Sequence, residues 1–539
     1  MPTRHVRPGK AGKLGTPVRI LWATALAAAT LSASGCTTLS DYINNCFKVG
    51  PNYKRPTAPV AQKWIDADDV RVRSEPEDDS HWWTVFNDPV LSDLIQTAYR
   101  ENLTLREAGF RVLQARASLG IAVGELFPQN QEMIGSYTRR GVSENVANRI
   151  ATPQRWFSTW DYGFGLAWEL DFWGRFRRSI EAAEDSLDAS VENYDDVLVL
   201  LISDVASNYV RYRVLEQQLA YTRAVVKLQT QSLQIAQAKF KGGQVSQLDV
   251  NQAQANLSAT EVVIPQLEIS LREVNDKLCV LLGLPPEDLK AKLGAAAIPT
   301  APTSVAVGIP ADLLRRRPDI RRAEREAAAQ CAEIGVADAE FYPQISINAT
   351  WGWAAEHFKD LFAHGSFRGS IGTEFHWAIL NYGRILNNVR VQDARFQELV
   401  AHYQQIVLRA DGEVEDGLAR FLKAQDEQRN AKDSVKAQQA AVKDAIAQYE
   451  GGLTDFNRVA VVEEQLVSRQ NQLAQAEGEI ALGLIQVYRA LGGGWQIRCD
   501  TNATPATNAT PSDATSLAPA PQIHQLPNST NQAPPVAER

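Results

Sequence analysis

Residues 160–171 read WDYGFGLAWELD, and in this stretch large apolar side chains alternate with small, polar or charged ones. Because successive side chains of a β-strand point to opposite faces, the spacing predicts a strand with one apolar face. The same alternation recurs at residues 345–353 and 371–377, whereas the strand preceding Arg139 alternates poorly. Each run has about the 9 to 11 residues that a tilted membrane strand needs. Four such strands are predicted.

The strands favour a membrane barrel shared by several chains. Trp and Tyr cluster at the strand ends, which is typical of an aromatic girdle, although a water-soluble sandwich with one buried face is the alternative. Four strands cannot close a barrel, and open edges leave backbone groups without partners in lipid. Three copies would supply about 12 strands, enough to surround a lumen.

The chain contains two tandem copies of one pattern. Residues 103–129 return at 318–344, and Gly242-Gly243 returns as Gly451-Gly452. Such internal repetition indicates one structural unit used twice.

Each copy carries two long helices. From about Arg177 to Lys241 apolar residues recur every three or four positions, which predicts a coiled-coil helix about 95 Å long. A second helix follows Gly242-Gly243, and Pro265 inside it predicts a kink or break near Ile264. The second copy repeats the plan at about 384–450 and 455–491.

Composition excludes several classes of protein. The chain is 45% apolar and 22% charged, too polar for a bundle of membrane helices, and its net charge of -8 disfavours nucleic-acid binding. Neither the five cysteines nor His357, His364 and His376 have metal-ligand spacing. No nucleophile or nucleotide-binding motif occurs, so we predict no enzyme, no metal site and no cofactor.

The N-terminus predicts export and lipidation. Five basic residues precede an apolar run from Ile20 to Leu31, which is typical of a signal peptide. The following Ala33-Ser34-Gly35-Cys36 resembles a bacterial lipobox, although Ala33 stands where leucine is usual. The resemblance implies acylation of Cys36; cleavage after a small residue, without lipid, is the alternative.

Several motifs together resemble the TolC-like outer membrane efflux proteins, in particular their lipoprotein branch that serves resistance-nodulation-division (RND) pumps. They are Val49 to Pro56, Trp82-Trp83 with Phe86 to Pro89, Trp168 to Asp171 with Gly174-Arg175, Leu314 to Ile320, and Gly335 to Pro343. The resemblance implies a mixed α and β fold of tandem repeats, with four membrane strands and long antiparallel coiled-coil helices in each chain. It also implies a homotrimer with a 12-stranded barrel in outer membrane lipid, a periplasmic helical tunnel, and docking to a periplasmic adaptor protein and an inner membrane RND pump.

The glycine turns acquire a role through this resemblance. A turn between antiparallel helices needs a residue that tolerates positive φ, as glycine does. In the family these tips also carry the closed gate and the adaptor contact, which implies the same roles for Gly242, Gly243, Gly451 and Gly452. Asp249 and Tyr449 match family residues that would form a hydrogen bond between hairpins. Thr454 and Arg458 depart from the arginine and aspartate found there in some members.

The function expected from these features is a passive, gated outer membrane exit duct for small molecules such as drugs or metal ions. Secretion of a protein through the same fold and a periplasmic coiled-coil scaffold without a pore are the alternatives. The expected divisions are a signal peptide (1–35), a lipoprotein extension (36–90), repeat 1 (91–290), a flexible linker (291–311), repeat 2 (312–495) and a disordered tail (496–539). The run Arg315-Arg316-Arg317 is predicted to be a solvated face, with Asp319 capping the next helix.

Overall fold

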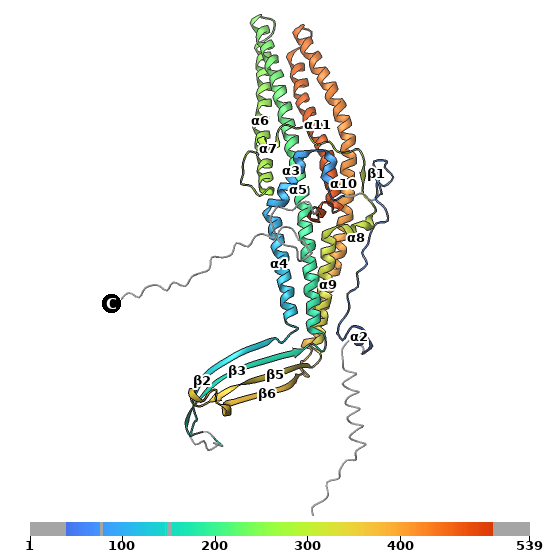
Figure 1. Cartoon of the computed structure of the whole chain (residues 1–539). Helices are drawn as coiled ribbons and strands as arrows, with labels where there is room; N and C mark the ends of the chain where they lie inside the picture. Colours follow the sequence, from blue (N-terminus) through green and yellow to red (C-terminus); the bar gives the residue numbers. More distant parts are fainter. Residues whose placement is uncertain (1–38, 76–78, 146, 148–153, 500–539) are drawn as a thin grey trace, which may run out of the picture. The chain divides into compact units, whose positions relative to one another are not determined.

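The computed structural model describes residues 39–75, 79–145, 147 and 154–499 (Figure 1). They form two compact units, each assembled from three stretches of the chain. The first unit takes residues up to Pro56, 115–187 and 324–401 and contains a four-stranded sheet; the second takes 57–114, 188–323 and the chain from His402. The predicted signal peptide, Cys36 and the chain beyond residue 499 lie outside the described residues.

The sheet is antiparallel, with the strand order β2-β3-β5-β6. Its strands are β2 (Asn130–Gly141), β3 (Trp156–Leu170), β5 (Gln344–Ala355) and β6 (Phe367–His376). Each repeat contributes one hairpin, and pairing of β3 with β5 joins the two hairpins. The four predicted strands are therefore confirmed, and β2 and β6 each have a single neighbour within the described sheet.

The register brings the apolar side chains of neighbouring strands together. Tyr162 lies opposite Trp353, and Phe164 lies opposite Trp351 with their rings stacked at 5.7 Å. On the other face Arg368 reaches across β5 to both carboxylate oxygens of Asp161, at 2.5 and 2.6 Å. One face is thus aromatic and aliphatic and the other polar, as the alternation predicts.

The helices of the two repeats match in length, which confirms the tandem repeat. Helices α5 and α10 have 67 residues each, α6 and α11 have 35, and α4 and α9 have 22. Their bounds are α4 Leu103–Gly124, α5 Arg175–Lys241, α6 Gln247–Leu281, α9 Pro318–Ala339, α10 Arg384–Glu450 and α11 Phe456–Ala490. Shorter elements are α2 (Leu39–Asn44), η1 (Trp82–Phe86), α3 (Pro89–Glu101), η2 (Pro310–Asp312), α8 (Leu313–Arg316), η3 (Phe358–Asp360) and η4 (His364–Ser366). In the described part of the chain no helix is both long and apolar enough to cross a membrane.

Helix α6 continues through Pro265, so of the kink or break predicted near Ile264 the break is wrong. Proline inside a helix removes one backbone hydrogen bond and costs about 3 kcal/mol. Buried residues lie on both sides of it, with Leu257 and Thr260 before and Val274 and Leu278 after. Tertiary packing of these two segments offsets the local cost and keeps the helix continuous.

Residues 291–311 are packed, and the prediction that this connector is flexible is wrong. The segment begins within α7 (Lys290–Leu293), and its strand β4 (Val305–Ala306) pairs in parallel with β1 (Val72–Arg73). Val305 and Val307 are buried, and the Trp64 indole N–H donates to the Gly308 carbonyl at 3.0 Å. Its Pro and Ala composition did not reveal a partner more than 200 residues away.

Only Arg315 of the arginine run is exposed, so the prediction of a solvated face is wrong for Arg316 and Arg317. Arg317 is 8% exposed and forms ion pairs with Asp319 at 2.7 Å and with Glu413 at 2.8 Å, and Arg316 pairs with Asp79 at 2.9 Å. The Asp319 carboxylate accepts bonds from Arg317, and the one helix N–H it accepts is the adjacent one, of Ile320. Helix α9 begins at Pro318, so Asp319 lies inside its first turn and not at the N-cap, and the capping prediction is wrong.

The predicted disordered tail starts too early, because residues 496–499 are ordered. They belong to η5 (Trp495–Cys499), in which Arg498 binds both oxygens of Asp195 at 2.5 and 3.0 Å. The Trp495 ring lies against the guanidinium groups of Arg321 and Arg498, at 4.7 and 5.4 Å. Contacts with residues far along the chain hold this segment in place, and its polar composition does not indicate them.

Candidate functional site

The turns α5–α6 and α10–α11 lie at the same end of the helical unit (Figure 1). Gly242 donates its N–H to the Ala238 carbonyl, and Gly451 repeats that bond to Ala447, each at 3.0 Å. The second glycines have φ of +71° at Gly243 and +77° at Gly452, which L side chains rarely adopt. These paired glycines therefore end both long helices in the same way.

A hydrophobic core holds the two hairpins together just below the turns. Tyr449 is 3% exposed, its ring meets the ring of Phe456 edge to face at 5.3 Å, and the Lys239 ammonium lies 5.3 Å from its centre. The buried members of the core are Leu233, Ala236, Ala253, Leu257, Ala445, Tyr449, Phe456, Val459 and Ala460. All four helices contribute to it, so the tip region is a small four-helix bundle.

Asp249 and Tyr449 link the two hairpins of one chain. The Tyr449 hydroxyl donates to the Asp249 carboxylate at 3.3 Å, joining α10 to α6. Burial first, and the Asp249 carboxylate next, raise the pKa of Tyr449 to about 12, so the phenol keeps its proton. The geometry brings these two predicted residues together, whereas Arg458 is exposed on α11. Their part in gating stays a prediction.

Sequence inspection missed a buried carboxylate in the same bundle. Glu463 of α11 is fully buried and accepts hydrogen bonds from Ser232 of α5 at 2.5 Å and from Asn256 of α6 at 3.3 Å. A signal existed, because Val459, Glu463, Leu466 and Gln470 follow the helical spacing of a buried face. A charged residue on a buried helix face needs a hydrogen-bond or ion-pair partner, because burial of an unpaired charge is unfavourable.

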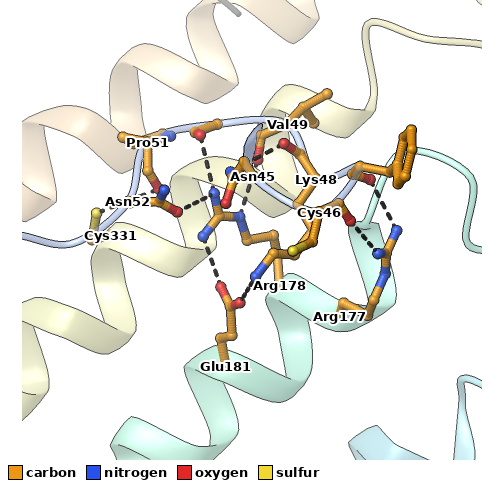
Figure 2. Close-up of polar contacts among 12 residues, drawn as sticks. Asn45, Cys46, Lys48, Val49, Pro51, Asn52, Arg177, Arg178, Glu181 and Cys331 are labelled. Atoms are coloured by element: carbon orange, nitrogen blue, oxygen red, sulfur yellow. Dashed lines mark hydrogen bonds and ion pairs between the residues drawn. The ribbon is translucent and has the colours of Figure 1, made fainter. Parts of the chain in front are cut away.

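The segment following the predicted lipidation site is clamped by two adjacent arginines (Figure 2). Arg177 donates to the carbonyls of Cys46 and Phe47 at 2.7 and 2.9 Å. Those two residues have left-handed φ of 53° and 60°, a conformation costing each of them about 1–2 kcal/mol. The arginine offsets part of that cost by satisfying their carbonyl groups.

Arg178, the second arginine, is 3% exposed and holds the next part of the segment (Figure 2). It donates to the Val49 and Gly50 carbonyls at 3.0 Å and to the Asn52 side chain at 3.1 Å. Its charge is balanced by Glu181 at 2.7 Å, which also binds Lys48. We call residues 45–52 the strap. It is fixed to the first turns of α5.

The described residues contain no cluster of three or more His, Cys, Asp or Glu side chains that could hold a metal ion. Cys46 and Cys499 are exposed free thiols, and Cys279 and Cys331 are buried free thiols. The contacts described at the tips and strap hold helices and chain segments together, and they include no paired nucleophile and base.

The chain joins an amphipathic sheet in sequence to long helical hairpins. The solved structure of the outer-membrane channel OprN is similar to this chain, with a TM-score of 0.77 and 31% identity, covering 83% of this chain and 99% of that one. The family model described as outer membrane efflux protein matches residues 94–284 and 309–493. This chain belongs to the outer membrane efflux protein family, and it is an outer membrane channel of the TolC-like fold and not an enzyme.

Two curated relatives extend along most of the chain. The toluene efflux pump outer membrane protein TtgF of Pseudomonas putida is 29% identical, over 85% of this chain and 96% of its own length. The probable outer membrane lipoprotein SilC of Salmonella typhimurium is 27% identical, over 84% of this chain and 96% of its own length.

Proposed function

We propose that three copies of this chain form the exit duct of a tripartite RND-type efflux system, carrying small molecules from the periplasm to the exterior. The observation that carries the proposal is the open sheet, in which the outer strands β2 and β6 leave one edge each without a neighbouring strand in the described part of the chain. In lipid such edges must be paired, and four strands are too few to close on themselves. Three copies joined edge to edge give a barrel of about 12 strands.

The tips are the proposed site of the gate and of adaptor contact. Leu248 and Leu453 stand close behind the two glycine turns and are 70% and 82% exposed. Large apolar side chains at the end of a hairpin support contact with a protein partner. A periplasmic adaptor that holds the tips would couple the duct to an inner membrane pump, which supplies the energy.

The proposed cargo is a class of small solutes such as drugs or metal ions. The names of the relatives favour this over protein secretion, since TtgF is called the outer membrane protein of a toluene efflux pump. The choice of solute is assigned to the pump, because a passive duct needs no dedicated binding site.

The particle purified in detergent should have a native mass of about 170 kDa, since each chain is 59.5 kDa before its leader is removed. Native mass spectrometry measures this value. A monodisperse monomer would leave the sheet edges unpaired and favour the scaffold interpretation.

We also propose that Cys36 carries the lipid anchor and that the leader ends at residue 35. Cys36→Ser should remove the acyl mass from the intact chain, while the trimer stays in the outer membrane because the barrel itself lies in lipid. The Cys46→Ser variant is the control and should keep the acyl mass. Equal masses for Cys36→Ser and the wild type, apart from the Cys-to-Ser difference, would rule out lipidation there.

A further inference from the structure

Glu463 lies at the meeting point of three helices in the tip bundle. One carboxylate oxygen binds Ser232 of α5, and the other binds Asn256 of α6. The side chain has no contact with water, since the residue is fully buried. These two bonds tie α11 to both helices of the other hairpin, so they exist only while the hairpins are packed together.

Within the described part of the chain, no cation pairs with this carboxylate. The buried and half-buried residues of the same bundle include Val442, Ala445 and Ile446 on α10, Leu257 and Thr260 on α6, and Leu233 and Ala236 on α5. Among the described residues the titratable groups that face this core are Lys239, Asp249 and Tyr449. They surround the turns, and Lys239 is seven residues, or about 10 Å of helix, beyond Ser232.

A second buried polar side chain near Glu463 also raises the free energy of the packed hairpins. Gln229, one turn from Ser232 on α5, is 1% exposed, and neither its amide oxygen nor its nitrogen has a partner in the described part of the chain. A buried polar group that has left water without gaining a partner destabilises the packed state. The packed and separated arrangements of the hairpins are therefore closer in free energy than an apolar layer would leave them.

The proton balance of Glu463 follows from its burial. Loss of water raises the pKa of the carboxyl, while the bonds from Ser232 and Asn256 lower it, and burial has the larger effect. When the hairpins separate, water reaches the carboxyl and its pKa returns toward the usual 4.5. The packed state binds the proton more tightly, so acid favours packing, and packing weakens as the pH rises through the raised pKa.

We propose that Glu463 is the positioning residue of the gate and that its protonation state couples closure of the tips to pH. The proposal rests on the proposed function, which places the gate at the tips. Protonated Glu463 holds α11 against α5 and α6; ionisation or removal of its carboxyl weakens that hold.

The test is the leak conductance of the full-length wild-type channel in planar bilayers between pH 5 and pH 8, without adaptor or pump. The wild type should leak several-fold more at pH 8 than at pH 5. Glu463→Gln keeps the shape and a bond to Ser232 but cannot ionise, so its leak should change less than twofold over this range. Glu464→Gln removes the exposed neighbouring carboxylate and should behave like the wild type.

Two results would overturn the inference. One is the same pH dependence in Glu463→Gln as in the wild type; the other is a pH-independent wild type. A folded Glu463→Leu trimer, checked by its resistance to dissociation in SDS, should also lose the pH dependence. Asp249→Ala tests separately whether the gate lies at the tips. If it does not, the leak of this variant at fixed pH should equal that of the wild type.

Discussion

Replacing Arg178 with methionine should free the strap and raise its cleavage by trypsin at Lys48 about 100-fold. The guanidinium donates to Val49, Gly50 and Asn52, so one buried side chain holds three positions of the strap. Loss of a buried charge with several bonds costs about 3 kcal/mol, which corresponds to about 100-fold in the open population of the strap. Methionine retains the apolar stem, so the loss is mainly that of the polar contacts.

The rate of strap cleavage, followed by mass spectrometry on the intact trimer, measures this effect when opening and closing are faster than cleavage. Arg325→Met is the matched control, because Arg325 pairs with Asp185 at 3.1 Å with about half of its side chain exposed. Exposed pairs contribute about 0–1 kcal/mol, so that variant should be cleaved less than tenfold faster than the wild type. A wild-type rate in Arg178→Met would show that other contacts hold the strap.

Asp249→Ala should raise the leak conductance of the channel about 5- to 30-fold. The variant removes the acceptor of the Tyr449 hydroxyl and with it the bond that joins α6 to α10. A hydrogen bond to a charged group of this kind contributes about 1–2 kcal/mol when partly exposed, equivalent to that change in the closed-to-open ratio. Tyr449 is buried, so its hydroxyl would also lose the acceptor that offsets its burial.

Single-channel recording in planar bilayers at constant pH measures this leak. Tyr449→Phe removes the same bond from the other side and should leak to a similar extent, while its ring still packs on Phe456. Asp444→Ala removes an exposed carboxylate of α10 and should leave the conductance unchanged. Unchanged conductance in a well-folded Asp249→Ala trimer would remove this residue from the gate.

Much of the fold followed from short-range patterns. Alternation around Trp160 predicted the strands and their faces, and three-four spacing predicted the helices that end at Gly242 and Gly451. Periodicity succeeds because the geometry of a strand or helix decides which side chains share a face. A break at Pro265 and a flexible connector at 291–311 do not occur, because packing partners far along the chain override the local propensity.

Some residues of the candidate site could likewise be found from sequence, and others could not. The glycines of both turns could be found from sequence, because a helix end needs a particular backbone conformation at a particular place. The bond between Asp249 and Tyr449 was anticipated only through resemblance to a family. Glu463 and the clamp around Arg178 were not anticipated, since their partners Ser232 and Val49 lie 231 and 129 positions away.

Local spacing along the chain is enough to identify the residues that form strands and helices, the repetition of the pattern, and the apolar face of the strands that alternate clearly. The meeting of side chains that are distant in sequence depends on the packed fold. Ser232 reaches Glu463, Arg178 binds the strap, and Arg498 binds Asp195 because the chain folds these elements together. Secondary structure depends on spacing within a few turns, whereas the partner of a buried charge depends on how distant segments pack.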